Sequence, residues 1–211
     1  MKTTKKITLA LGLLTLAAAS QAQTTTTMSA PAGLLGQQYT EVSLGLDDIK
    51  HVSNHGYSFT AAANTPLIPG KLDAGASYSY SWIGGAFRGH ANTVGGYATA
   101  YAPLKGVKPF VSAGLAYQWA SSRFGSGDNE AHWGAATGVE IPAGVVTLTP
   151  RISYSDDFEG SRASSQAWHF AVEANHWVNK TTAVFVTIGK TDVRGSTFDS
   201  WSYEIGLRAR F

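Results

Sequence analysis

The sequence predicts an all-β fold: a membrane-spanning, antiparallel, up-and-down β-barrel of ten strands, with eight strands as the alternative. Three observations predict it. Over residues 38–211, apolar residues alternate with small or polar ones, and no stretch has the helical period. Short and long connections between these runs alternate along the chain. The aromatic residues gather at the run ends that border the long connections, which is where a membrane barrel carries an interfacial girdle.

A secretory signal peptide is predicted over residues 1–22. Lys2, Lys5 and Lys6 form a basic start, residues 7–19 form an apolar stretch, and residues 20–22 (SQA) form a small-x-small cleavage site. The apolar stretch is too short to cross a bilayer as a helix, which takes about 20 residues. We therefore expect cleavage after residue 22 and export. Residues 23–36, with four successive threonines, are expected to form a flexible periplasmic tail, followed by the barrel over residues 37–211.

Composition excludes several other classes of protein. The chain has no cysteine, so it can form neither a disulfide scaffold nor a thiolate metal site. Charged residues make up 14% of the chain, against about 25% in a typical soluble domain. Without the three leader lysines, 13 basic residues face 14 acidic ones, so the formal net charge falls from +2 to about −1. No basic patch for nucleic acid remains.

Ten alternating runs predict the strands. The clearest is the last, residues 201–211 (WSYEIGLRARF), which has aromatic and aliphatic residues on one face and polar residues on the other. Four more clear runs are 72–82, 111–119, 132–141 and 168–175, and weaker runs are 39–47, 56–65, 93–102, 145–155 and 182–191. Pro150 lies within one of these runs and cannot donate a ladder hydrogen bond, so a bulge is expected there.

The connections predict how the chain is threaded. Short, turn-forming connections are expected at residues 65–70, 103–106, 142–144 and 178–181, and longer polar ones at 47–55, 84–90, 121–130, 156–165 and 192–199. In an outer-membrane barrel the short turns lie in the periplasm and the moderate loops outside. An even number of strands then places both termini in the periplasm.

The aromatic residues decide which face of the sheet points outward. Those of the apolar phase lie at the loop end of their strands, as a girdle requires: Trp82, Trp119, Trp133, Tyr154, Trp168 and Trp201. A soluble sandwich or lipocalin-like barrel is the competing interpretation, but such a core has no reason to gather its tryptophans at one rim. The opposite face is small and polar, which suits a narrow lumen.

Several charged residues fall in the lumen phase. They are Glu41, Asp73, Glu140, Arg151, Glu173, Glu204, Arg208 and Arg210. Isolated charges in a narrow cavity are costly, so we expect them to pair across the lumen. Because the first and last strands close the barrel, Glu41 is expected near Arg208 or Arg210. These eight charged residues fit two interpretations. They could form a constriction that selects among ions, or a salt-bridge network that plugs the barrel.

The C-terminal WSYEIGLRARF, ending in Phe211, resembles the last strand of bacterial outer-membrane β-barrels. The stretches KLDAGASYSYSW, GVKPFVSAGLAYQW and TPRISYSDDF resemble the small outer-membrane barrel family that includes opacity-type and OmpX-like proteins. The likeness spans about residues 37–211. It implies a Gram-negative outer-membrane location, lipopolysaccharide around the loop-side rim, and barrel assembly machinery that reads the strand ending at Phe211 as an assembly signal.

For function, the sequence favours a monomeric envelope barrel without enzymatic activity, cofactor or metal, which is either structural or a narrow passive pore for small solutes. The first alternative is a surface adhesin or binding barrel that acts through its extracellular loops. The second is an outer-membrane lipid hydrolase or protease. The residues considered for such chemistry are Asp156 and Asp157 with His169, and His132 with Ser121 or Ser122, although geometry rather than spacing defines a catalytic site.

Overall fold

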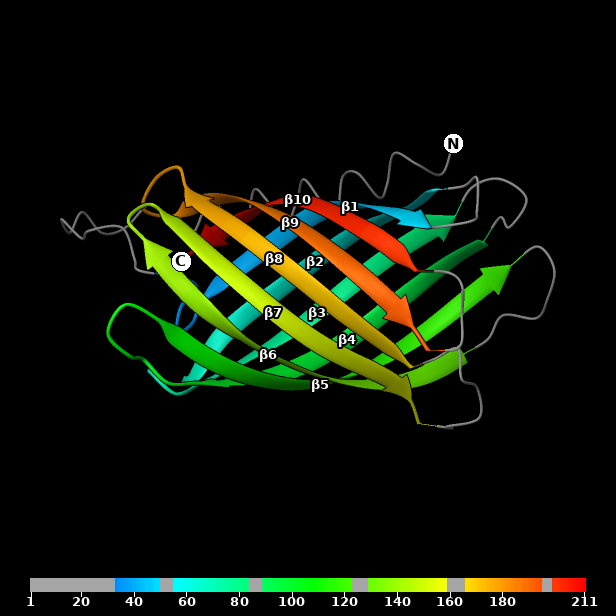
Figure 1. Ribbon diagram of the computed structural model, residues 1–211, viewed down its shortest axis with the longest axis horizontal. Coiled ribbons are helices and arrows are strands. Elements are labelled where there is room, and N and C mark those ends of the chain that lie inside the picture. Colours follow the sequence, from blue (N-terminus) through cyan, green and yellow to red (C-terminus); the bar gives the residue numbers. More distant parts are fainter. Residues whose placement is uncertain (1–32, 50–54, 84–88, 123–128, 159–165, 195–198) are drawn as a thin grey trace.

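Ten antiparallel strands close into a barrel in the computed structural model (Figure 1). The structure describes residues 33–49, 55–83, 89–122, 129–158, 166–194 and 199–211. The strands are β1 (Tyr39–Ile49), β2 (His55–Ile68), β3 (Leu72–Ile83), β4 (Gly89–Tyr101), β5 (Lys108–Ser122), β6 (Asn129–Ala143), β7 (Val146–Asp157), β8 (Ala167–Trp177), β9 (Thr182–Val193) and β10 (Ser200–Arg210). Each strand pairs with its sequence neighbours, and β1 pairs with β10 along its whole length. The predicted ten-stranded barrel is confirmed, and closure leaves no strand edge unpaired.

Short and long connections separate to opposite ends of the barrel (Figure 1). Residues 69–71, 102–107, 144–145 and 178–181 join strands at one end, which we name the turn end. Gly70, Gly106 and Gly144 have positive φ angles of 77°, 81° and 68° in three of these connections. Glycine adopts this conformation without the steric cost that a Cβ imposes, so it permits the chain to reverse tightly. The other five connections join strands at the opposite end, which we name the loop end.

The ladder between β6 and β7 is interrupted near Pro150. Registered pairing stops at Gly138↔Arg151 and resumes at Ile141↔Leu148. Residues 139–140 and 149–150 lie between these pairs, so two residues oppose two and none is inserted. The expected bulge at Pro150 is therefore wrong. A local gap in one ladder accommodates the missing N–H group, and β7 remains continuous because its other edge stays paired with β8 throughout.

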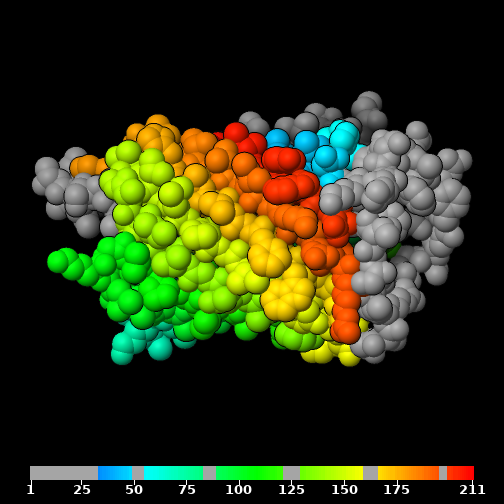
Figure 2. Space-filling model, viewed as in Figure 1, coloured from blue at the N-terminus to red at the C-terminus, as the bar shows by residue number. Residues whose placement is uncertain are grey.

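The barrel has an apolar outside and a polar inside. Leu115, Ile205 and Val172 are 62%, 56% and 52% exposed, whereas Asp73 and Glu140 are each 1% exposed. This distribution is the reverse of that in a soluble protein and is typical of a transmembrane barrel, whose outward residues contact lipid. Figure 2 shows one side of the outer surface, crossed by β7 to β10. No helix in the described ranges is long and apolar enough to cross a membrane.

Candidate functional site

A buried arginine organises the lumen near its turn end. Arg208 of β10 donates from Nε to Glu41 of β1 (2.6 Å) and from both terminal nitrogens to Glu173 of β8 (2.5 and 3.0 Å). It also donates to the Asn175 side-chain oxygen (3.1 Å). Paired bonds from a guanidinium to one carboxylate are the strongest arrangement of this kind. We name Arg208, Glu41, Glu173 and Asn175 the ionic layer.

Register explains how three strands supply this layer. Glu41 is the direct cross-strand partner of Arg208, and residues on paired positions point to the same face of a sheet. Glu173 lies on β8, on the far side of β9, where inward residues must be small or flat if Arg208 is to pass them. Ala183 and Phe185 are the β9 residues paired with Arg208 and Gly206, and both are buried. The guanidinium crosses β9 over the flat face of the Phe185 ring and there reaches the Glu173 carboxylate.

The phenyl ring of Phe185 forms one face of the layer. The Arg208 guanidinium carbon lies 3.8 Å from the ring centroid, which is a close cation–π contact in a desolvated site. Gly206 is required beside this ring, because a Cβ at that position would lie 2.5 Å from ring atoms of Phe185. Charge, ring and glycine therefore form a packed plug across part of the lumen.

A second layer is built from the chain before β1. The backbone N–H groups of Leu34 and Leu35 both donate to one carboxylate oxygen of Glu140, at 2.5 and 2.9 Å. Lys108 neutralises that carboxylate at 3.1 Å and also donates to the Leu35 carbonyl oxygen at 3.0 Å. We name residues 33–38 the N-terminal strap, because they lie across the turn end and join β5 and β6 through these bonds.

Other strand residues hold the remainder of the strap. Asp73 accepts the Gly36 N–H (2.8 Å) and a bond from Asn64 (3.2 Å), and Asn64 also donates to the Gln37 carbonyl (3.0 Å). Arg210 donates to the Gln37 side chain at 3.2 Å. The Leu34 side chain, 7% exposed, packs among residues that close the bottom of the lumen: Trp177, Ala183 and Tyr39.

The strap changes one expectation from the sequence. The sequence predicts a flexible tail that includes residues 33–36, but in the structure their backbone groups bind Glu140, Asp73 and Lys108. The expected tail therefore ends before Gly33, and residues 1–32, including the predicted signal peptide, lie outside the described residues. The sequence signal for this ordered strap is the Leu34–Leu35 pair, because two adjacent leucines can anchor an otherwise polar segment in an apolar site.

The structure places all eight expected lumen charges in contact with lumen or strap groups. Glu41 pairs with Arg208 rather than Arg210, and Arg210 reaches the strap instead. Arg151 lies 4.0 Å from Glu173, and Glu204 accepts a hydrogen bond from Ser43 at 2.5 Å. The sequence did not identify several residues on which the two layers depend: Lys108, Asn64, Asn175 and Phe185. Their roles depend on register between distant strands.

Above the ionic layer, toward the loop end, the lumen wall is made of small side chains. A hollow of about 330 Å³ lies against β3 to β7, and its inward lining residues are Ser77, Gly95, Tyr97, Ser112, Gly114, Ala116, His132, Gly134, Ala136, Ser153 and Ser155. None of these except Tyr97 and His132 is large. The lumen is therefore open beside the small residues, and the charged residues and the strap fill space near its turn end.

The first group considered for catalysis is divided between two faces of the sheet. Asp156 points outward, where it accepts hydrogen bonds from Tyr154 (3.0 Å) and Gln166 (3.2 Å). His169 points into the lumen, with Nδ1 2.9 Å from the Thr191 hydroxyl. Asp157 shares the inward face with His169, but it lies four residues beyond Ser153, the direct cross-strand partner of His169. The structure therefore does not bring the three side chains together.

The second group lies at the loop end of the lumen. His132 is paired in register with Asp157, and its Nε2 lies 3.7 Å from Glu130. The side chains of Ser121 and Ser122 fall outside the described residues. Among the residues that the structure does describe, no group of three or more His, Asp and Glu side chains could hold a metal ion.

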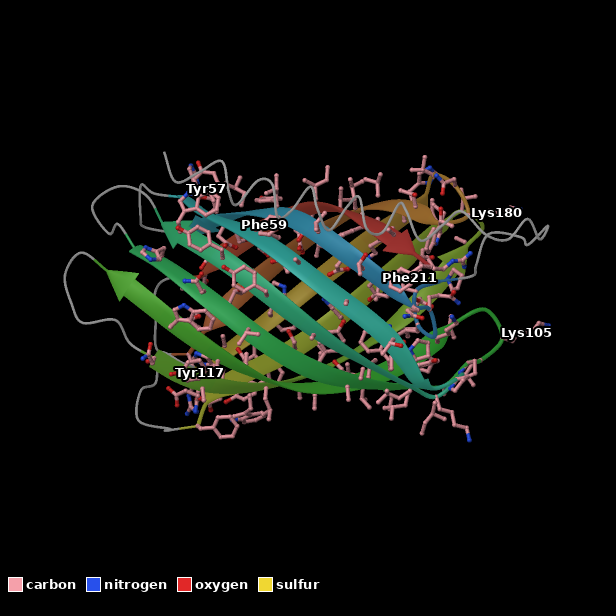
Figure 3. All side chains as sticks on the ribbon, turned by 180° about the vertical axis from the view of Figure 1, so that it is seen from behind. Tyr57, Phe59, Lys105, Tyr117, Lys180 and Phe211 are labelled. Carbon is pink, nitrogen blue, oxygen red and sulfur yellow. The ribbon has the colours of Figure 1, made fainter. Side chains whose placement is uncertain are left out.

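The expected aromatic girdle lies on the outer surface at the loop end. Tyr154 contacts both Trp133 (5.6 Å between ring centroids) and Trp168 (5.0 Å), so rings of three adjacent strands form a continuous band. Trp82 contacts the ring of Tyr57 (5.4 Å between centroids), and Trp119 contacts the ring of Tyr117 (6.2 Å). Figure 3 shows Tyr57, Phe59 and Tyr117 near the loop end, and Lys105, Lys180 and Phe211 near the turn end. Phe211 is half exposed there, and its role as an assembly signal stays a prediction.

Comparisons with known proteins agree with this architecture. No family model matches the chain, and no curated protein matches it. The translocator domain of the autotransporter NalP from Neisseria meningitidis is similar, with a TM-score of 0.50 at 9% identity over 98% of this chain and 96% of that one. Neisserial surface protein A gives a TM-score of 0.44 at 16% identity (82% and 96% covered), and the NanC porin 0.47 at 9% (82% and 100% covered). At these identities the likeness to the NalP domain concerns the fold alone.

Proposed function

We propose that the protein is a monomeric, integral β-barrel of the bacterial outer membrane, and that it serves in the envelope as a structural barrel whose lumen is closed at the turn end. Support for the membrane comes from the apolar outer surface and the aromatic band at one rim. A closed barrel also leaves no backbone edge in contact with hydrocarbon. The short turns then face the periplasm, as the family resemblance implies.

The observation that carries a closed lumen is the stacking of two layers at one end. In the ionic layer, Arg208 is 5% exposed and bound to two carboxylates from different strands. In the strap layer, Glu140 and Asp73 hold three backbone N–H groups of residues 34–36. The ionic layer lies on β1 and β8 to β10, and the strap is bound by β2, β3, β5 and β6, so under our proposal the two layers together obstruct the axis. A buried charge stripped of its partner costs about 3–5 kcal/mol, so the ionic layer does not open spontaneously at an appreciable frequency.

A narrow pore remains the second candidate, because the strap is bound by hydrogen bonds rather than by a covalent link and the wall beyond the ionic layer is hollow. The adhesin alternative rests on loop residues 50–54, 84–88, 123–128, 159–165 and 195–198, which lie outside the described residues. Under our proposal the protein has no catalytic role. Asp156 and His169 point to opposite faces, and Asp157 lies four residues beyond Ser153, the cross-strand partner of His169.

Planar-bilayer recording of the refolded protein tests the proposal. The wild-type barrel should show at most rare, small openings. Glu140→Ala combined with Asp73→Ala removes the acceptors for the strap and should raise the frequency of openings. Glu204→Ala is the matched control, because Glu204 is a lumen carboxylate that contacts Ser43 and not the strap. A stable, long-lived conductance in the wild type would refute a closed lumen, and equal openings in the control would show that the strap is not the barrier.

A further inference from the structure

The outer surface between β6 and β10 contains a groove of about 970 Å³. Its lining includes outward side chains of five strands: Thr137, Val139, Pro150, Ile152, Phe170, Val172, Ile188, Lys190 and Trp201. Most of these are apolar, and Phe170, Val172 and Ile188 are each about half exposed. The volume is at the upper end of the roughly 300–1,000 Å³ range of small-molecule sites. Figure 2 shows the side of the barrel on which β7, β8 and β9 cross.

The groove lies beside a gap in the sheet. Its inward-phase lining residues are Gly138, Arg151, Ala171 and Gly189, and three of these four have at most a methyl side chain. The interrupted ladder at residues 139–140 and 149–150 lies at its turn-end side. The groove therefore lies where the β6–β7 ladder is interrupted.

One cation stands at the loop-end side of the groove. Lys190 is paired in register with Phe170 on one side and Trp201 on the other, so its side chain shares their outward face. It makes no hydrogen bond or ion pair with any residue that the structure describes. Of the lysines in the described ranges, Lys190 alone lies in the outward phase of a strand; Lys71, Lys105 and Lys180 lie in turns, and Lys108 binds Glu140.

Lys190 lies at the depth of the aromatic girdle. Trp168 of the girdle is the direct partner of Asp192, two residues further along β9, and Trp201 is the direct partner of Lys190. Girdle residues lie at the boundary between hydrocarbon and headgroups, so the ammonium group is at the level where lipid phosphates begin. Asp192 is the nearest charge of opposite sign on this face, and no ion pair joins the two.

We propose that this groove binds a phosphorylated lipid of the loop-side leaflet, with an acyl chain along Phe170, Val172 and Ile188 and the phosphate on Lys190. An ammonium group without a protein partner at the membrane boundary attracts an anionic group, and the phosphate of a lipid is placed there when its chain fills the groove. Trp201 covers the junction of headgroup and chain. This inference rests on the proposed membrane location, and it names a ligand site that does not depend on whether the lumen is closed.

The test compares two lipids that differ only in the phosphate. The barrel is reconstituted in phosphatidylcholine vesicles containing either phosphatidic acid or diacylglycerol with the same chains, then extracted and weighed intact by native mass spectrometry. The wild type should retain one phosphatidic acid in preference to diacylglycerol. Lys190→Gln should lower this preference about fivefold, since one lysine near a membrane surface contributes about that factor. Lys190→Arg should restore it, and Lys180→Gln at the turn end is the matched control.

Two further arms examine the groove and the source of the phosphate. Val172→Trp narrows the groove without touching Lys190 and should also lower retention, whereas unchanged retention would overturn the acyl-chain part of the site. Excess inorganic phosphate should not displace the lipid, and displacement would overturn the groove as a lipid site. Equal retention by wild type and Lys190→Gln would overturn the proposal as a whole. An unboiled gel of the same vesicles reports folding and insertion, so failure of the membrane location is seen separately.

Discussion

Replacing Arg208 by methionine removes the charge at the centre of the ionic layer while preserving most of the side-chain volume. Glu41 and Glu173 would then be left as two carboxylates, with side chains 17% and 5% exposed, and Glu173 would lose both of its paired bonds. Breaking a buried ion pair by removing one partner costs about 3–5 kcal/mol, because the remaining charge is uncompensated. We expect Arg208→Met to lower the free energy of unfolding by about this amount.

The neutralised layer provides the internal control. Arg208→Met combined with Glu41→Gln and Glu173→Gln removes all three charges, and replacing a whole buried ion pair is often neutral or stabilising. The triple variant should therefore be more stable than the single variant, although it carries more substitutions. Glu41→Ala should cost less than Arg208→Met, about 1.5–3 kcal/mol, because Arg208 keeps its two bonds to Glu173.

Equilibrium unfolding in urea from lipid vesicles, followed by tryptophan fluorescence and by unboiled gel, measures these differences. Arg208→Met within about 1 kcal/mol of wild type, the upper range of an exposed pair, would show that water rather than protein satisfies the carboxylates. A triple variant as unstable as Arg208→Met would show that the cost comes from packing against Phe185 and not from uncompensated charge.

Three further predictions concern the wall, the strap and assembly. Arg at Ala113, an outward residue, should cost about 2–4 kcal/mol of stability in vesicles, whereas Arg at the inward Ser112 should act through the lumen; equal costs in unfolding experiments would reverse our assignment of faces. Any openings of the wild-type barrel should be small and mildly cation-preferring in reversal-potential measurements, because acidic residues outnumber basic ones in the lumen; clear anion preference would contradict this. Deleting Phe211 should reduce folded, heat-modifiable protein in cells much more than it weakens a barrel refolded in detergent. Wild-type assembly of that variant in cells would mean that the C-terminal residue is not an assembly signal.

The architecture was predictable from sequence because it depends on local periodicity. A two-residue repeat assigns each strand and its two faces, and strand edges satisfied in a closed ring are the solution that a membrane permits. The positions of Trp133, Tyr154 and Trp168 at their strand ends were enough to say which face meets lipid. Lumen charges could likewise be identified by phase, and their tendency to pair followed from the cost of isolated buried charge.

The choice of partners required the tertiary structure. Glu41 and Arg208 are 167 residues apart in the chain, and Arg208 rather than Arg210 reaches Glu41 because the register that closes β1 on β10 pairs them directly. Glu173 joins them because the Arg208 guanidinium passes over the Phe185 ring of β9. Glu140 and Asp73 bind backbone amides of the strap instead of other side chains, and no residue pattern encodes that choice. Local sequence determines which way a side chain points, whereas register and closure determine what it meets.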